Sequence, residues 1–208
     1  MVVYNFLQHG LMVRRIIGGR EFYERVVRAV EVLGLSKVIT DKNICVVEEK
    51  LVDIARSLEY CSNIVTSSLR YFMLTELVAK LYKFSHRIAR EIVVGVDTGV
   101  SMAYAVILDG VLLDWGQLYS LEAFFDELYN VMCMFKARKR SVKVGINGNK
   151  HMLNIGASQC YRLEYVDENR TNEKSLYLEK IVSGLKVSRH VRSAIAIALR
   201  KGVEVKSV

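Results

Sequence analysis

The pattern of apolar and polar residues changes character at about residue 90. Before that point, apolar residues recur at helical spacing over 21–33, 46–60 and 67–82, and a short β-branched run covers 2–7. After it, the apolar runs are strand-like and are separated by turn residues. The pattern therefore predicts a helix-rich N-terminal extension over 1–90 and a separate domain over 91–208.

The second part of the chain begins with three apolar runs over 91–97, 101–108 and 111–118. Asp109-Gly110 separates the last two and is a strong hairpin signal, so we expect antiparallel neighbours. The pattern then predicts helices over 121–135, 173–184 and 190–201, strands over 142–146 and 161–166, and a weak helical or loop segment over 150–158. The order β-β-β-α-β-α-β-α predicts an α/β fold with a mixed five-stranded sheet and helices on both faces.

Composition adds a charge and a core to this picture. The 208 residues are 51% hydrophobic, which is enough for one large or two small domains, and the formal net charge is +8. A basic protein favours polyanionic partners, because Lys and Arg that neutralise phosphates release counterions. The alternative is a basic, solvated surface with no such partner.

The four cysteines lie far apart and form no CxxC pair, which argues against a zinc ribbon. No secretory leader is evident, and no run reaches the roughly 18 apolar residues that a membrane-spanning helix needs. We therefore expect a cytoplasmic protein with reduced thiols and no membrane partner.

Three motifs in the second part carry a resemblance. The run IVVGVDTGVSMAYAV over 92–106 has an apolar strand followed by Gly-x-Asp-x-Gly. The run YVDENRTNE over 165–173 follows the predicted fifth strand, and HVRSAIAIAL over 190–199 opens the last helix. In this order they resemble the RuvC/YqgF-like family of the RNase H-like superfamily, including archaeal-type RuvC-like resolvases of Holliday junctions. Residues 1–90 resemble no family.

The resemblance implies phosphodiester hydrolysis at a Mg²⁺ (or Mn²⁺) site built from carboxylates of different elements. Asp97 would be the ligand shared by two metal ions. Asp167 or Glu168 would supply a second carboxylate, with Glu168 preferred because one of the pair must point away. His190 would bind metal, or orient or deprotonate the attacking water. Structural alternatives are a strand-ending turn at Asp97, a solvated pair at 167–168 and a surface His190.

Two positions depart from the family pattern. Asn147 stands where the fourth strand of RuvC nucleases ends near a carboxylate, and Ser193 stands where they carry Asp one turn into the last helix. Both changes favour a binding module that has lost catalysis. The residues expected to contact nucleic acid are basic or amide side chains, namely Asn147, Asn149, Lys150, Arg138, Lys139, Arg140, Arg170, Arg189 and Arg192.

The resemblance thus predicts a metal-dependent, structure-selective endonuclease that acts on four-way DNA junctions. The implied partner is branched DNA, and the implied assembly is a homodimer. One alternative is a YqgF-like nuclease acting on RNA precursors. Another is a non-catalytic module that binds nucleic acid. An actin-like or sugar-kinase ATPase would need a second Asp-x-Gly strand start, which residues 1–90 do not contain.

Overall fold

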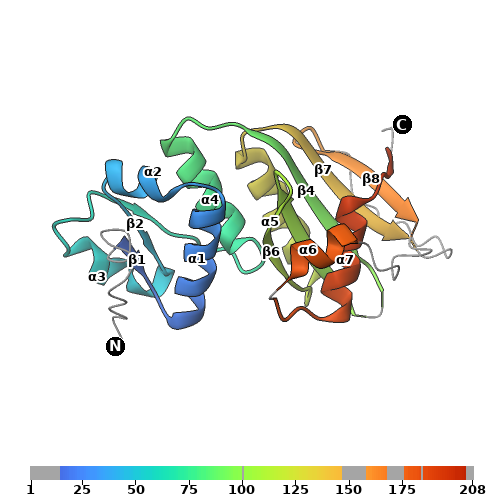
Figure 1. Ribbon diagram of the computed structural model, residues 1–208, viewed down its shortest axis with the longest axis horizontal. Helices are drawn as coiled ribbons and strands as arrows, with labels where there is room; N and C mark the ends of the chain where they lie inside the picture. The colour runs from blue at the N-terminus through green and yellow to red at the C-terminus, as the bar shows by residue number, and fades with distance from the viewer. Residues whose placement is uncertain (1–14, 100, 147–157, 168–175, 184, 205–208) are drawn as a thin grey trace. The chain divides into compact units, whose positions relative to one another are not determined.

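The chain forms two compact units, residues 1–87 and 88–208. The computed structural model in Figure 1 describes residues 15–99, 101–146, 158–167, 176–183 and 185–204. The strand expected at 2–7 lies outside these residues. Within the described residues no helix is long and apolar enough to cross a membrane.

The N-terminal unit is built on a three-stranded parallel sheet with the order β1-β2-β3. Its elements are β1 (Ile16–Ile17), α1 (Arg20–Val32), α2 (Ser36–Asp41), β2 (Ile44–Val47), the short 3-10 helix η2 (Glu49–Leu51), α3 (Val52–Arg56), β3 (Asn63–Val65) and α4 (Met73–Phe84). Every residue of β2 is buried, so the middle strand shows no alternation of apolar and polar positions.

The helices of this unit agree with the prediction of a helix-rich extension, but the sequence pattern does not indicate the small sheet that they accompany. The range 46–60, predicted as one helix, begins with the last residues of β2. Its helical part is limited to η2 and α3. Strands of two to four residues are too short to reveal a period, and a buried parallel strand is apolar throughout. The helix predicted over 67–82 begins later, at Met73, whereas α1 agrees with its prediction.

The C-terminal unit holds a six-stranded mixed sheet with the order β6-β5-β4-β7-β8-β9. Its elements are β4 (Ala89–Asp97), β5 (Ala103–Leu108), β6 (Val111–Gln117), α5 (Leu121–Met134), β7 (Ala137–Ile146), β8 (Arg162–Asp167), α6 (Leu176–Val182), α7 (Arg189–Leu199) and β9 (Val203–Glu204). The first three strands are antiparallel neighbours, and β7 and β8 run parallel to β4.

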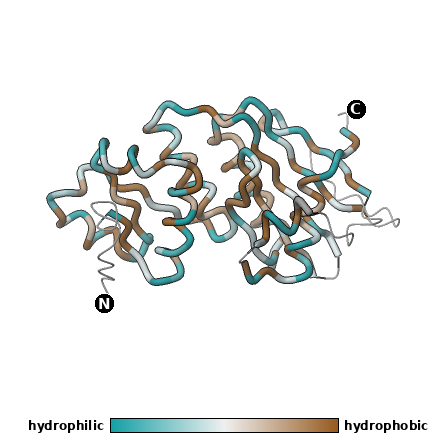
Figure 2. The backbone as a smooth tube through the Cα atoms, viewed as in Figure 1, coloured by the Kyte–Doolittle hydropathy of each residue, from teal (hydrophilic) through white to brown (hydrophobic). Residues whose placement is uncertain are grey.

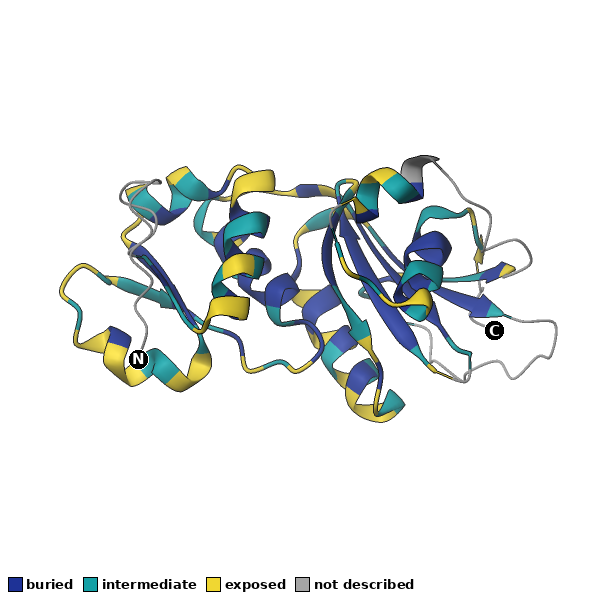
Figure 3. Ribbon diagram, turned by 60° about the horizontal axis from the view of Figure 1, so that its bottom comes forward, coloured by how far each residue is buried: buried dark blue, intermediate teal, exposed yellow. Residues whose placement is uncertain are grey.

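This arrangement confirms an α/β unit with a mixed sheet, and it corrects two details. The sheet has six strands because β9 adds to β8 as a short antiparallel edge. In addition, β7 begins at Ala137, five residues before the start of the strand predicted over 142–146. Figures 2 and 3 show that β4 and β5 are apolar and buried over most of their length.

The two faces of the sheet are covered by different helices. Ala103 and Ala105 of β5 belong to a buried cluster with Val191, Ile195 and other residues of α7. Tyr104 between them points to the opposite face, where its ring lies 5.4 Å from that of Phe124 on α5. The side chains of β4, β5 and β7 therefore face either α7 or α5 in alternation.

The expectation of reduced thiols is also wrong, because the structure contains no free cysteine among its described residues. Cys45 pairs with Cys61 and Cys133 pairs with Cys160, with Cα–Cα distances of 5.4 and 4.9 Å. The partners lie 16 and 27 residues apart in sequence. Only the pairing of β2 with β3 reveals that Cys45 lies beside the segment that carries Cys61.

Candidate functional site

Asp97 is the last residue of β4, which lies between β5 and β7 near the middle of the sheet. It is only 4% exposed. Its Oδ1 accepts a hydrogen bond of 3.1 Å from the Gly99 amide, and Thr98 Oγ1 donates one of 2.8 Å to the Gly145 carbonyl of β7. These bonds fix the turn that follows the strand, and the Gly99 amide gives the buried carboxylate of Asp97 a hydrogen-bond partner.

His190 comes to this carboxylate from the first turn of α7. Its Nδ1 lies 3.4 Å from Asp97 Oδ2, and its side chain is 38% exposed against 6% for that of Asp97. Ser188 caps the helix, and its hydroxyl accepts a hydrogen bond of 3.3 Å from the Val191 amide. The cap places His190 at a defined position, with Nδ1 toward Asp97 and the side chain partly exposed.

Gly95 allows α7 to lie directly on the central strand. A Cβ atom at this position would be 2.1 Å from the Ala194 carbonyl oxygen and 2.7 Å from the Ala198 amide nitrogen. Ala194 and Ala198 present only methyl groups to β4, so the helix backbone approaches the strand closely. The close contact between α7 and β4 brings the first turn of the helix to Asp97.

Lys143 of β7 fixes the other end of α7, a role that no sequence pattern indicates. Its Nζ donates 3.0 Å to the Ala198 carbonyl and also to the Arg200 carbonyl, and lies 3.9 Å from Glu164 Oε2. Burial lowers the pKa of Lys143 below its ordinary value, although the Glu164 carboxylate acts in the opposite direction. A cation at a helix C-terminus interacts favourably with the exposed carbonyls.

Asp167 does not share the face of Asp97. The register aligns Gly95 with Lys143 and Lys143 with Glu164, so these residues share the α7-facing side with Asp97. Asp167 lies three residues after Glu164 and therefore faces the opposite, α5-facing side of the sheet. Asp167 is also exposed, and its carbonyl accepts a 3.2 Å bond from Arg200. Glu168, the preferred member of the acidic pair, lies outside the described residues.

The basic run on β7 lies at the far end of the sheet from Asp97. Lys139 pairs in register with Glu91, six residues before Asp97, which corresponds to about 20 Å at about 3.3 Å per strand residue. Lys139 Nζ lies 2.6 Å from Glu91 Oε1, and Arg140 donates to the Met132 carbonyl. Arg138 shares this end of the strand. The structure does not bring these three cations to Asp97.

Two other predicted cations do lie beside the site. Arg189 is exposed in the first turn of α7, next to His190, and Arg192 lies one turn further along. Arg192 Nη1 is 2.9 Å from Glu179 Oε1 on α6, so part of its charge is already neutralised. Asn147, Asn149, Lys150 and Arg170 lie outside the described residues.

The described residues supply only some of the ligands that a metal ion would need at this site. Among the described residues, no group of three His, Cys, Asp or Glu side chains converges as a metal cluster. Asp97 and His190 supply one carboxylate and one imidazole, and Ser193 adds no charge one turn later. Mg²⁺ commonly binds through one or two carboxylates and completes its shell with water, so this donor set fits a weakly bound ion.

Comparison with known protein families, characterised proteins and solved structures finds no match to this chain.

Proposed function

We propose that residues 88–208 form an RNase H-like domain that hydrolyses phosphodiester bonds in nucleic acid at a Mg²⁺ or Mn²⁺ site on Asp97. The observation that carries the proposal is the Asp97–His190 pair. A buried carboxylate ends the central strand, and the first turn of the last helix brings an imidazole to 3.4 Å from it.

The order of the strands gives further support. Three antiparallel strands are followed by two that run parallel to the first, as the resemblance of the sequence motifs implies. All three motif positions that the structure describes, at 97, 167 and 190, lie at the end of a strand or the start of a helix. Carboxyl ends of strands in such sheets are the usual place for a ligand.

Each side chain then has a chemical role. Asp97 would hold the ion, and a bound divalent ion supplies a water of lowered pKa and neutralises charge on the phosphate oxygens. The Nδ1 edge of His190 faces Asp97, which leaves Nε2 free to accept a proton from water. Arg189, beside it and exposed, would attract the phosphate backbone. Glu168 is proposed as the second carboxylate.

A second candidate, a module that binds nucleic acid without cleaving it, rests on a specific observation. Asp97 contributes the one carboxylate that the described residues bring to the site, since Asp167 faces the other side of the sheet.

The DNA junction and the RNA precursor also remain separate proposals for the substrate. A homodimer that presents two such sites would suit a symmetric four-way junction.

The decisive experiment compares the protein with Asp97→Asn on labelled four-way DNA junctions, linear duplex and structured RNA, with Mg²⁺ or Mn²⁺. We expect cleavage of one of these substrates, reduced at least 100-fold in the variant, because removal of the charge releases the ion. Such a loss corresponds to about 2.7 kcal/mol of transition-state stabilisation.

Asp126→Asn provides the matched control, since Asp126 is an exposed carboxylate on α5 with no role in the site. It should cleave like the parent protein. If the parent binds a substrate tightly but does not cut it, and Asp97→Asn binds equally well, the hydrolytic function is refuted and the binding module takes its place.

A further inference from the structure

A separate pocket lies in the N-terminal unit, and it is independent of the Asp97 site. Its volume is about 250 Å³. Its lining comes from the helix after β1, the segment after β2 and the segment after β3, namely Phe22, Glu48, Glu49, Lys50, Ser67, Ser68, Leu69 and Met73. All three parallel strands therefore lead into the pocket at their carboxyl ends, which is where open α/β sheets bind ligands.

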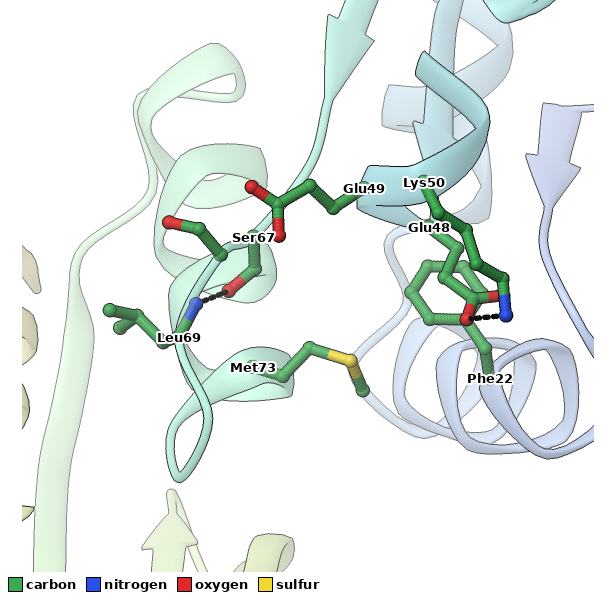
Figure 4. A pocket seen from close by; sticks show the side chains of 8 residues that line it. Phe22, Glu48, Glu49, Lys50, Ser67, Leu69 and Met73 are labelled. Carbon is green, nitrogen blue, oxygen red and sulfur yellow. Dashed lines mark hydrogen bonds and ion pairs between the residues drawn. The ribbon is translucent and has the colours of Figure 1, made fainter.

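One wall of the pocket is held rigidly by buried polar contacts (Figure 4). Ser67 is 7% exposed and donates a 2.5 Å hydrogen bond to Glu76 Oε2, and its oxygen also accepts the Leu69 amide at 3.2 Å. The other oxygen of Glu76 lies 2.7 Å from Lys80 Nζ, which in turn donates to the Thr66 carbonyl. The loop after β3 thus has a fixed shape before any ligand arrives.

The opposite wall presents two glutamates with different roles. Glu48 Oε2 accepts a 2.7 Å bond from the Gly19 amide at the start of α1, and Glu48 Oε1 lies 2.7 Å from Lys50 Nζ. In the described part of the chain, neither Glu49 nor the hydroxyl of Ser68 has a hydrogen-bond or ion-pair partner. Both line the pocket and are exposed, so they are available to a ligand.

The charges and the apolar residues restrict the ligand. Glu48, Glu49 and Lys50 leave one excess negative charge in the lining, which disfavours an anion inside the pocket. The Lys50 ammonium occupies the side of Glu48 that a metal ion would need. Phe22, Leu69 and Met73 provide an apolar surface for a flat ring, and Figure 4 shows the Met73 sulfur on the side of the pocket toward Phe22.

We propose that this pocket binds a ribonucleoside, with the two sugar hydroxyls donating to the Glu49 carboxylate and the base against Met73 and Leu69. A carboxylate after the second strand of a parallel α/β sheet accepts hydrogen bonds from ribose hydroxyls in this manner. The volume is slightly below the roughly 300 Å³ at which pockets for drug-sized ligands begin, so it suits a nucleoside and not a dinucleotide. A phosphate, where present, points to solvent.

Titration calorimetry of the full-length protein with adenosine and with 2′-deoxyadenosine tests the proposal. We expect adenosine to bind at least tenfold more tightly, and Glu49→Gln to lose at least tenfold in adenosine affinity. Ser68→Phe should abolish binding, because the ring fills the pocket from an exposed position. Glu59→Gln is the matched control, since Glu59 is an exposed glutamate of the same unit outside the pocket.

The proposal is overturned if adenosine does not bind at millimolar concentration, if the deoxynucleoside binds equally well, or if Glu49→Gln and Glu59→Gln behave alike. Melting curves followed by far-ultraviolet circular dichroism establish that each variant is folded. Asp97→Asn should bind adenosine normally, so failure of the nuclease proposal does not affect this result.

Discussion

The two sheets of this protein differ in the length of their strands, and therefore in how much each sheet depends on the helices packed against it. The strands of the N-terminal sheet have two, four and three residues, whereas β4, β6 and β7 of the C-terminal sheet have nine, seven and ten. Short strands make few ladder bonds and depend on the helices packed against them. Both sheets nevertheless place polar residues at the carboxyl ends of parallel strands. Long strands are therefore not needed to form a candidate binding site.

The contrast extends to how each unit positions its polar residues. In the C-terminal unit, a helix backbone rests on a glycine of the central strand and brings His190 to Asp97. In the N-terminal unit, loops are fixed by buried hydrogen bonds such as that from Ser67 to Glu76. We expect the first arrangement to be sensitive to side-chain volume and the second to charge and protonation.

The largest effect should come from Gly95→Val. The new side chain would meet the Ala194 carbonyl at about the 2.1 Å found for a Cβ alone, and backbone cannot move aside as a flexible side chain can. We expect a loss of more than about 4 kcal/mol, or failure of the C-terminal unit to fold. Trp115 of β6 is the single tryptophan, so its fluorescence during urea unfolding reports on this unit.

Gly19→Ala supplies the comparison from the other unit. A Cβ there would lie 3.5 Å from Glu48 Oε2, an ordinary contact, so the cost should be below about 1 kcal/mol. Equal losses for the two variants would contradict the difference in packing between the units.

The disulfides come next, one in each unit. The loops they close span 16 and 27 residues, for which chain entropy gives about 3 kcal/mol for Cys45–Cys61 and about 3.5 kcal/mol for Cys133–Cys160. Cys45→Ala with Cys61→Ala should destabilise the N-terminal unit, and Cys133→Ala with Cys160→Ala should destabilise the C-terminal one. Thiol titration in denaturant should detect no free thiol before reduction and four after it.

Each pair of alanine variants should leave the other unit's transition unchanged, as followed by Trp115 fluorescence for one unit and hydrogen exchange for the other. Four titratable thiols in the unreduced protein would show that the pairs do not form.

The smallest effects should appear in the dependence on pH. Burial lowers the pKa of Lys143, so the folded unit holds this proton less tightly than the unfolded chain does. Stability should therefore rise with pH between the lowered pKa and the ordinary value of about 10.4. Lys143→Met should abolish this alkaline rise. It should also cost about 2 kcal/mol at neutral pH, because the Ala198 and Arg200 carbonyls lose their donor.

Glu48 should give the opposite signature in the N-terminal unit. Its partial burial acts to raise its pKa, but the hydrogen bonds from Lys50 and the Gly19 amide outweigh burial and lower it. The stabilisation is thus complete above the ordinary value and is lost as the pH falls through the lowered pKa. The melting temperature should therefore differ less between pH 3 and pH 6 for Glu48→Gln than for the parent protein. These assignments would be contradicted if Lys143→Met kept the alkaline rise in stability, or if Glu48→Gln lost as much stability as the parent protein between pH 6 and pH 3.

Much of the C-terminal unit could be predicted because its elements are long and locally consistent. The hairpin at Asp109-Gly110, the apolar run ending at Asp97 and the spacing of α7 all carry strong signals. The strand β7 begins earlier than its apolar pattern predicts, because its first four residues are mostly polar and not buried. The end of a strand that reaches solvent does not show the alternating period. The two-residue β9 was too short to detect.

The candidate site was predictable residue by residue but not as a set. Separate motifs predict Asp97 and His190 as site residues, and the two side chains lie together in the structure. Charge alone predicts that Arg138, Lys139 and Arg140 contact nucleic acid, yet the register of β4 with β7 puts them at the other end of the sheet from Asp97. The role of Lys143 cannot be predicted from the sequence, because a lysine inside a strand does not indicate that its ammonium reaches the end of a helix.

The sequence by itself determined the two-part organisation of the pattern, the α/β class of the second part and the carboxylate at the end of its central strand, because these depend on local periodicity. Tertiary structure alone decided the parallel N-terminal sheet and its pocket, the pairing of the cysteines and the face on which Asp167 lies. Each of these depends on which strands become neighbours and in what register, and contacts between residues distant in sequence leave no local pattern.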